Sequence, residues 1–340
     1  MDRNTLFAFF LISLVLIFTP KYLELVSPKK TTEQAVATDS LKNSLKDKIV
    51  LEKTNFSKPK KISISSFNSL YKEKTIEIEN NLFLAIISSK DGGSFGSFSF
   101  KNYFTKDSQN VNIINQENWK NLTLEITDQE GILVDLSSPW KTDFSSYDGF
   151  IKDTTTLNFK KEIQKDVFIT KSLTFYPNSY KITCEIDASM LPSNFLRENI
   201  KIGWANGLNP SEENIEDDQI YFQAYSYLGG EQENLKVKEN KPQSLSFNGS
   251  VDWSAIRTKY FTAALIPKIP SLIKTTTISG VKRNKNETYN MFFSFNASTK
   301  TSFDLYLGPL EYNRIKSLGR NLESIMDFGW SFIRPISKGV

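Results

Sequence analysis

The sequence predicts a mainly β protein built as an antiparallel sandwich. Short runs in which apolar and polar residues alternate recur from Ser63 to Leu307, and this period of two is typical of strands that bury one face. No helical pattern separates these runs, which favours antiparallel pairing over a parallel sheet. The 26 Phe and 13 Tyr residues can supply a large core, and aromatic side chains favour strands.

The first element is an apolar segment from Leu6 to Phe18, in which Ser13 is the polar exception. A helix of this length spans about 20 Å, against about 30 Å for the hydrocarbon core of a bilayer. That length fits a signal peptide as well as a membrane anchor. Lys21 to Val26 can lengthen the helix, and the Ala35–Ala37 cleavage-like site lies far beyond it. We therefore predict a transmembrane anchor over residues 1–26.

Residues 27–61 are rich in Lys, Ser, Thr and Pro and show little apolar periodicity, so they are predicted to be a flexible linker. The sandwich domain is predicted over residues 62–308. The alternating runs that define it are Ile76–Ile78, Leu82–Ile86, Phe95–Phe100, Leu122–Ile126, Ile132–Leu136, Thr155–Phe159, Val167–Phe175, Tyr180–Ile186, Tyr221–Tyr227, Tyr260–Ile266, Tyr289–Phe295 and Thr301–Leu307.

The last element, residues 309–340, changes to a helical period. Apolar residues face polar ones at helical spacing, which predicts a mixed-face helix from Leu310 to Phe328. Periodicity alone favours packing on a soluble domain, but aromatic residues beside Arg334 and Lys338 are typical of a membrane interface. The residues predicted to form this interfacial amphipathic helix are Ile315, Leu318, Leu322, Ile325, Met326 and Trp330.

Composition argues against most catalytic classes. The chain has no histidine, which excludes Ser-His and Cys-His nucleophile pairs and imidazole metal sites. Its one cysteine, Cys184, lies in an alternating stretch and is predicted to be a buried small hydrophobe. A net charge of +4 from 42 basic and 38 acidic residues gives no nucleic-acid footprint. We expect no catalytic residue, no cofactor, no metal and no nucleic-acid partner.

Two loops invite a functional interpretation. Asp91 to Gly96 is rich in glycine but lacks the Lys-Ser/Thr of a phosphate-binding loop, so a hairpin turn is favoured. An acidic run could hold calcium, but its spacing does not match an EF-hand, and a charged exposed loop is favoured. The run consists of Glu212, Glu213, Glu216, Asp217 and Asp218.

Other acids and aromatic residues leave alternatives open. Paired carboxylates could serve glycosidase-like chemistry, but the sequence does not give their separation; the pairs are Glu185 with Asp187 and Asp143 with Asp148. Four large aromatic residues could line a ligand cleft, although a core position is commoner for such residues. They are Trp140, Trp204, Trp253 and Tyr225.

Two segments carry a resemblance to a known family. Gly249 to Pro267 reads GSVDWSAIRTKYFTAALIP, and Leu305 to Pro335 reads LYLGPLEYNRIKSLGRNLESIMDFGWSFIRP. Both resemble the YidC-type membrane protein insertases of bacteria, in the right order. Three further stretches fit the same pattern: Asn81 to Phe100, Ile169 to Tyr180 and Trp204 to Glu212.

The resemblance implies a fold and a location. It implies an antiparallel β-supersandwich, related in shape to sugar mutarotases, that lies in the periplasm, with one N-terminal transmembrane helix in the inner membrane and a C-terminal amphipathic helix. The family continues into five transmembrane helices that carry the insertion groove, whereas this sequence stops at Val340. We therefore expect an N-terminal portion of an insertase, without the conserved transmembrane core.

The resemblance also implies a function that is not enzymatic. The expected role is to assist insertion and folding of inner-membrane proteins, alone or with the Sec translocon. The expected partners are the lipid bilayer, nascent membrane proteins and Sec components. The alternative is a membrane-anchored periplasmic protein that binds or modifies carbohydrate, which the absence of histidine weakens because mutarotase relatives commonly use histidine.

Overall fold

The computed structural model describes residues 62–63 and 71–326, apart from 115–119, 145–148, 193, 197–198, 285 and 298–299. These residues belong to one compact unit that runs from Val50 to Val340. Within them, no helix is long and apolar enough to span a membrane. The predicted anchor over residues 1–26, the predicted linker over residues 27–61, and Trp330 lie outside the described residues.

One layer of the domain is an eight-stranded antiparallel sheet. Its strand order is β13 (Glu231–Leu235), β12 (Gln223–Leu228), β15 (Trp253–Arg257), β16 (Phe261–Pro267), β19 (Thr301–Pro309), β10 (Lys181–Asp187), β9 (Val167–Phe175) and β8 (Thr155–Gln164). Burial in β10 alternates at every residue, as the period-two pattern predicts.

Two smaller antiparallel sheets pack over this layer. The first has the order β14 (Gln243–Asn248), β17 (Ile273–Arg283), β18 (Asn286–Phe295), β11 (Ile200–Trp204) and β6 (Asn121–Glu125). The second has the order β2 (Thr75–Glu79), β3 (Phe83–Ser88), β4 (Ser94–Phe104) and β5 (Asn110–Asn112). A short parallel pair joins β1 (Ile62–Ser63) to β7 (Leu133–Val134). The predicted mainly β, antiparallel fold is confirmed.

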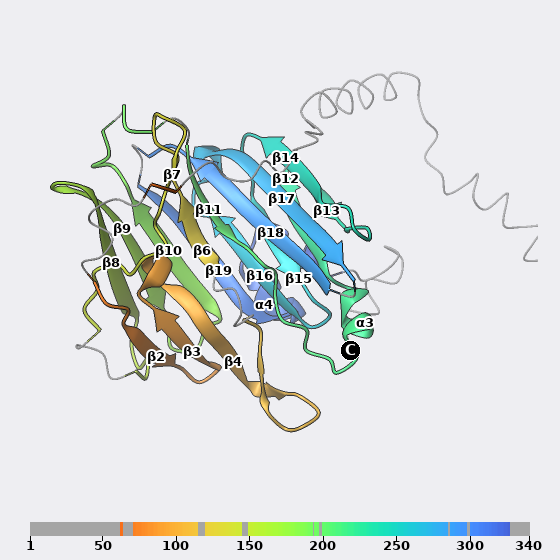
Figure 1. Cartoon of the computed structure of the whole chain (residues 1–340). Helices are drawn as coiled ribbons and strands as arrows, with labels where there is room; N and C mark the ends of the chain where they lie inside the picture. The colour runs from red at the N-terminus through yellow and green to blue at the C-terminus, as the bar shows by residue number, and fades with distance from the viewer. Residues whose placement is uncertain are drawn as a thin grey trace, which may run out of the picture. The chain divides into compact units, whose positions relative to one another are not determined.

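The core lies between the layers, which Figure 1 shows with β17 and β18 in front of β15 and β16. Aromatic rings join the sheets across it. Phe100 of β4 stacks on Phe261 of β16 with ring centroids 4.5 Å apart. Phe293 of β18 stacks on Phe303 of β19 at 5.8 Å. Trp140, Trp204, Trp253 and Tyr225 are all buried, so their interpretation as core residues is confirmed.

The turn between β3 and β4 contains the short 3-10 helix η1 (Lys90–Gly92). Asp91, Gly92 and Gly93 all have positive φ, at 53°, 66° and 97°. A Cβ atom on Gly93 would lie 2.6 Å from the ring of Phe159, so glycine is required there for space as well as for φ. The predicted hairpin turn is confirmed.

A lysine is buried beside this turn. Lys171 of β9 has no exposed surface, and its Nζ donates to the carbonyl oxygens of Leu122, at 2.6 Å, and Asp91, at 3.2 Å. Burial lowers the pKa of its ammonium group. Cys184 on the neighbouring strand is also fully buried, and burial raises the pKa of its thiol to about 11. The prediction that Cys184 is a core residue is confirmed.

The C-terminal segment differs from the expected single helix over Leu310–Phe328. It forms α4 (Tyr312–Ser317) and the 3-10 helix η3 (Leu322–Ile325). Between them Gly319, Arg320 and Asn321 have φ values of 75°, 54° and 58°, which end the helix. The prediction of one continuous helix is wrong because this backbone turn keeps the segment against the domain.

The remaining short helices lie in loops. They are α3 (Ile215–Gln219), which begins at an Asn214 cap, and the 3-10 helix η2 (Pro270–Leu272). The side chain of Asn214 accepts a hydrogen bond from the amide of Glu216, as helix caps commonly do. This cap places α3 directly after the acidic loop that begins at Glu212.

Candidate functional site

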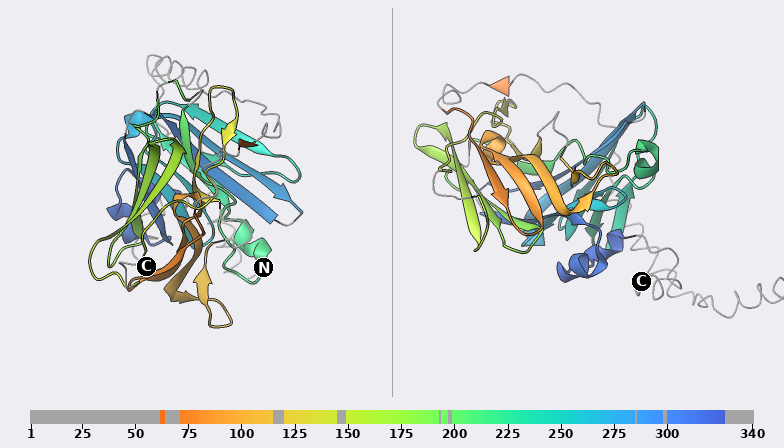
Figure 2. Two further views of the ribbon diagram at one scale, coloured as in Figure 1. Left: turned by 60° about the vertical axis from the view of Figure 1, so that its left-hand side comes forward. Right: turned by 90° about the horizontal axis from the view of Figure 1, so that it is seen from below.

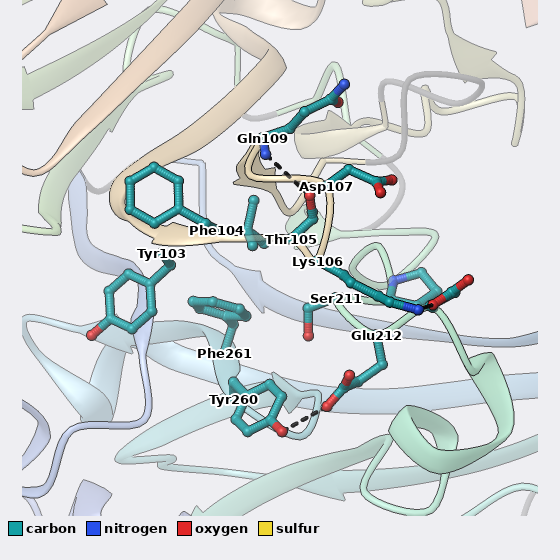
Figure 3. A pocket seen from close by; sticks show the side chains of 13 residues that line it. Tyr103, Phe104, Thr105, Lys106, Asp107, Gln109, Ser211, Glu212, Tyr260 and Phe261 are labelled. Carbon is teal, nitrogen blue, oxygen red and sulfur yellow. Dashed lines mark hydrogen bonds and ion pairs between the residues drawn. The ribbon is translucent and has the colours of Figure 1, made fainter.

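A cleft of about 670 Å³ opens at one end of the sandwich (Figure 3). One wall is the β4–β5 hairpin, the other is the loop before α3, and aromatic residues form the floor. The lining residues are Tyr103, Phe104, Thr105, Lys106, Asp107, Gln109, Val111, Pro210, Ser211, Glu212, Glu213, Tyr260 and Phe261.

The hairpin wall is held by its own turn. The amide of Thr105 donates to the carbonyl oxygen of Gln109 at 2.8 Å, and Ser108 takes a positive φ of 59°. The amide of Gln109 donates in turn to Thr105 Oγ1 at 3.3 Å (Figure 3). Phe104, just before this turn, leaves 61% of its surface exposed. The hairpin therefore presents a large apolar side chain on a closed turn.

The opposite wall is organised by Asp218, a fully buried carboxylate. Asp218 Oδ2 accepts from the amide and hydroxyl of Ser211 and from the amide of Glu212. Its Oδ1 accepts from the amide of Lys259 at 3.0 Å. A buried carboxylate needs several donors to offset its lost hydration, and these four supply them. Asp218 thus joins the acidic loop to the turn between β15 and β16.

The two loops also meet at the rim. Glu212 Oε1 accepts from the Tyr260 hydroxyl at 2.6 Å (Figure 3). The same oxygen accepts from Lys259 Nζ at 2.8 Å. The hydrogen bond from Lys259 is the main cause of the lowered pKa of Glu212, and it raises the pKa of Lys259. Across the cleft, Lys106 of the hairpin pairs with Glu213 at 2.8 Å, and both side chains are largely exposed. An exposed pair of this kind contributes about 0–1 kcal/mol to stability, so it does not by itself fix the distance between the two walls.

The aromatic floor continues into the core. Phe261 stacks on Phe100, and Tyr103 meets Phe261 edge to face at 5.4 Å. The hydroxyl of Tyr103 donates to Glu311, the residue before α4. Burial, followed by this hydrogen bond, raises the pKa of Tyr103, which stays a neutral donor at physiological pH. The floor is therefore packed on the core and linked to the C-terminal segment.

This arrangement suits binding. The Ser211 hydroxyl lies beside a carboxylate, but Asp218 accepts from both the amide and the hydroxyl of Ser211 and so fixes it as a structural donor. Among the described residues, no group of three Cys, Asp or Glu side chains is placed to hold a metal ion. An aromatic floor with a rim of paired charges can hold an extended apolar chain and orient polar groups along it.

The sequence interpretation of the acidic run needs a partial correction. Glu213, Glu216 and Asp217 are exposed, as a charged loop predicts. Asp218 is buried, because it caps two loops, and the prediction of an exposed loop is wrong for it. A buried acid of this kind shows no periodic signal in the sequence.

The predicted membrane-interface residues are placed differently from the expectation. Ile315, Leu322 and Ile325 have 0%, 0% and 1% of their surface exposed, and they belong to the core. Leu318 and Met326 are partly buried against it, while Trp330 lies outside the described residues. The expectation was a face toward lipid or the missing transmembrane core. The first three residues instead pack in the core of this domain, and the turn at Gly319–Asn321 brings Leu322 and Ile325 back to it.

A second, smaller cavity of about 370 Å³ contains the predicted carboxylate pair on β10. Glu185 Oε1 pairs with Lys300 Nζ at 2.6 Å. Asp187 accepts from the amide and hydroxyl of Ser189, and the hydroxyl bond is the main cause of its lowered pKa. The acid of a glycosidase pair needs a raised pKa, and the pKa of Asp187 is lowered, so Asp187 does not fit the acid role. Asp148, in the other predicted pair, lies outside the described residues.

Two stretches that are distant in sequence converge on the first cleft. Trp204–Glu212 supplies Pro210, Ser211 and Glu212, and Gly249–Pro267 supplies Tyr260 and Phe261. Both stretches were singled out for their resemblance to one family. Two of the five stretches that carry the resemblance therefore meet in one structural site.

Comparison with known proteins gives the same family. A profile of the YidC periplasmic domain matches residues 75–338. The membrane protein insertase YidC of Chlorobium phaeovibrioides is 29% identical over 359 residues, covering 99% of this chain and 59% of that protein. The membrane protein insertase YidC of Chlorobaculum tepidum is 28% identical with the same coverage. The chain spans about 59% of the length of these curated relatives.

Solved structures give a more distant likeness. A galactose mutarotase related enzyme from Lactobacillus acidophilus aligns with a TM-score of 0.42 at 9% identity, covering 69% of this chain and 97% of that one. The α-N-acetylgalactosaminidase NagBb of Bifidobacterium bifidum aligns with a TM-score of 0.46 at 10% identity, covering 74% of this chain and 39% of that one. At these values the likeness carries no argument about activity.

Proposed function

This chain belongs to the YidC periplasmic domain family, and we propose that it forms part of a membrane protein insertase that assists insertion and folding of inner-membrane proteins. The observation that carries the proposal is the family match over residues 75–338, supported by curated relatives that are named as insertases. In this proposal the activity needs no nucleotide hydrolysis and no catalytic residue. A hydrated path open to lipid lowers the cost of moving polar groups across hydrocarbon.

The proposal places the domain in the periplasm as a β-supersandwich, tethered by residues 27–61 to an inner-membrane anchor over residues 1–26. Residues 309–340 lead the chain toward the membrane, with Trp330 in the headgroup layer, where its amphipathic ring is favoured. Because Ile315, Leu322 and Ile325 are buried, the part of this segment before Met326 packs on the domain as part of its core. The membrane contact of this segment is assigned to the residues beyond it.

The cleft is proposed to contact partners of the insertase. An aromatic floor with Glu212, Lys259 and Tyr260 at its rim suits a nascent membrane segment or a loop of the Sec translocon. No observation on the described residues favours the carbohydrate alternative, since Glu185 is held by Lys300 and Asp187 by Ser189.

The test is replacement in a living insertase. This chain replaces the matched 59% of the Chlorobaculum tepidum insertase, and the chimera is expressed in cells depleted of their own insertase. Insertion of a single-span reporter protein is measured by protease accessibility of its exported end. We expect growth and reporter insertion to return to the level given by the intact Chlorobaculum tepidum protein. A chimera that reaches the membrane yet leaves the reporter uninserted contradicts the proposal.

Sec involvement needs a separate measurement. A photo-crosslinker placed at Glu213, which lines the cleft and whose side chain is 76% exposed, is expected to capture Sec components in the same cells. The matched control is Met190, which is 55% exposed and lies outside the cleft. Equal capture from both positions, or from neither, argues for an insertase that acts without Sec contact through this cleft.

A further inference from the structure

We propose that the cleft end of the domain faces the bilayer and that Phe104, Ile220 and Tyr221 enter the lipid headgroup layer. The proposal rests on the proposed function, because it takes a membrane protein's own bilayer as the partner. It assigns lipid contact to loops of the sandwich and not to the buried residues of the C-terminal segment. Three observations on the described residues carry it.

The first observation is a fixed exit point for the chain. Arg257 Nη1 donates to the carbonyl oxygen of Ile325 at 2.7 Å, and Trp253 Nε1 donates to that of Arg320 at 3.0 Å. Both donors are on β15 and are buried. Arg257 is the last residue of β15, so its bond places Ile325, near the end of the described chain, beside that end of the strand. If the chain continues toward a membrane, this end of the domain is the one brought close to it.

The second observation is where the exposed apolar side chains gather. Ten large hydrophobic residues are exposed in the described part of the chain, and five of them lie around this exit: Phe104, Ile215, Ile220, Tyr221 and Tyr260. Contacts place them there. The Tyr221 ring lies 5.8 Å from the Arg257 guanidinium, and the Tyr260 carbonyl accepts from the amide of Leu310 at 2.7 Å.

Phe104 shares the cleft with Tyr260, and Ile215 and Ile220 belong to α3 and its C-terminal cap. In Figure 1 the tip of the β4–β5 hairpin, α3 and α4 lie at the lower end of the domain, which the right-hand view of Figure 2 shows from below. Apolar and tyrosine side chains on one face are the side chains that suit the membrane–water boundary.

The third observation is the balance of charge on this face. Lys106 pairs with Glu213, and Lys259 pairs with Glu212, so these cations are already neutralised. Glu216 and Asp217 add exposed negative charge on α3. Such a face is not drawn to anionic lipid by its charge. Its association with a bilayer must come from apolar insertion, which zwitterionic lipid supports and salt does not weaken.

The experiment uses the full chain reconstituted into phosphatidylcholine vesicles. Cys184→Ala removes the native thiol, and single cysteines are introduced as Phe104→Cys and Ile220→Cys. The matched controls are Met190→Cys and Ile269→Cys, which replace side chains that are 55% and 54% exposed. Met190 follows β10, and Ile269 follows β16 at the end away from Phe261. Each cysteine carries an environment-sensitive fluorophore, and nitroxide on the lipid headgroups is the quencher.

We expect the probes at positions 104 and 220 to lose most of their fluorescence in vesicles with nitroxide headgroups, at low and at high salt. The control probes should lose little. Equal quenching at all four positions, or none at positions 104 and 220, overturns the proposal. If the fluorescence of those two probes changes only when another protein is added, the proposal is also overturned, because the face is then a protein-docking surface.

The outcome is separable from that of the proposed function. A chimera that inserts its reporter while positions 104 and 220 stay unquenched removes this inference alone. Quenching at both positions together with an inactive chimera contradicts the insertase proposal and supports the membrane-facing surface. A melting curve of each labelled variant identifies any variant that is unfolded, and the Tyr221→Cys variant replaces one that is.

Discussion

The guanidinium group of Arg257 donates from Nη1 to the backbone carbonyl oxygen of Ile325 at 2.7 Å. The two residues are 68 positions apart, and both are buried. Arg257 also donates from Nε to the carbonyl oxygen of Thr258. Burial of a guanidinium group costs free energy unless its N–H donors are hydrogen-bonded. This contact satisfies one of those donors and holds the C-terminal segment against β15.

Replacement of this arginine should loosen the segment. Arg257→Met keeps most of the side-chain volume but leaves the Ile325 carbonyl without its donor. We expect the free energy of unfolding to fall by about 1.5–3 kcal/mol, the range for hydrogen bonds to charged groups. Denaturant unfolding measures the change, and limited proteolysis should show faster cleavage near Arg320. Arg314→Met is the control, because Arg314 pairs with Glu311 at the surface, where both side chains are 42% exposed. Equal effects of the two substitutions would mean that Arg257 does not fasten the segment.

The C-terminal segment also shows how far the sequence could predict the fold. Its apolar spacing was identified correctly, but a spacing does not say whether the apolar face meets lipid or protein. Three consecutive residues with positive φ end the helix and keep the segment on the domain. A positive φ at Arg320 could not be predicted from the sequence, because non-glycine residues rarely adopt it. Covering by this segment also explains why Trp253–Arg257 is buried at every position. A strand buried on both faces has no alternation, so β15 was missed.

Asp218 offers a second test, because four donors from two loops converge on its carboxylate. Asp218→Asn has the same shape but replaces an acceptor oxygen with an NH₂ group that faces those donors. We expect a loss of about 2–4 kcal/mol in the free energy of unfolding, as for a broken buried polar network. Crosslinking through the cleft should fall as well, since Glu212 and Lys259 lose their common support.

The matched control is Asp217→Asn, one residue earlier and exposed. Its effect should stay within about 0.5 kcal/mol, the range for surface substitutions. If the two asparagine variants have the same stability, the network around Asp218 does not hold the cleft together. Asp217→Asn leaves the cleft geometry unchanged, so crosslinking through the cleft should fall in Asp218→Asn and not in Asp217→Asn.

Asp91 predicts a pH dependence of stability. It lies at the η1 turn, and burial raises the pKa of its carboxyl group to about 6 from an ordinary value of 3.8. A raised pKa in the folded state means that the folded protein binds this proton more tightly than the unfolded chain does. The stabilising contribution is therefore complete at pH below about 4 and is lost as the pH rises through 6.

Asp91→Asn removes this penalty. We expect the variant to be more stable than the natural protein by about 3 kcal/mol at pH 8 and equal to it near pH 4. The control is Asp166→Asn, an exposed turn residue whose φ of 61° resembles the 53° of Asp91. It corrects for the preference of asparagine for positive φ. Denaturant midpoints measured from pH 4 to 8 decide the issue; a pH-independent difference between Asp91→Asn and the natural protein means that burial of the Asp91 charge is not the cause.

The candidate site was less predictable than the fold. The strand under its floor, β16, was predicted from alternation over Tyr260–Ile266. The hairpin wall was not: the predicted run in β4 ended at Phe100, and β5 was missed because three residues are too few to show a period. The cleft depends on loops that meet only in three dimensions, and Asp218 and Lys259 are 41 residues apart. The family resemblance marked both stretches without saying that they touch. Local propensity carries no information about such long-range loop contacts.

The boundary of the folded domain gives the last prediction. The sequence placed it at residue 308, but Ile315, Leu322 and Ile325 complete the core beyond that point. Burial of one such side chain is worth about 1.5–3 kcal/mol, so removal of all three costs about 4.5–9 kcal/mol. That loss is comparable to the whole stability of a domain, about 5–15 kcal/mol. We expect residues 62–326 to fold alone, with a β-type far-ultraviolet spectrum and one cooperative melt that reductant does not change, since Cys184 is unpaired. Residues 62–308 should melt without cooperativity or aggregate. If both fragments melt at the same temperature, the C-terminal segment is not part of the core, and the bond from Arg257 to this segment does not stabilise the domain.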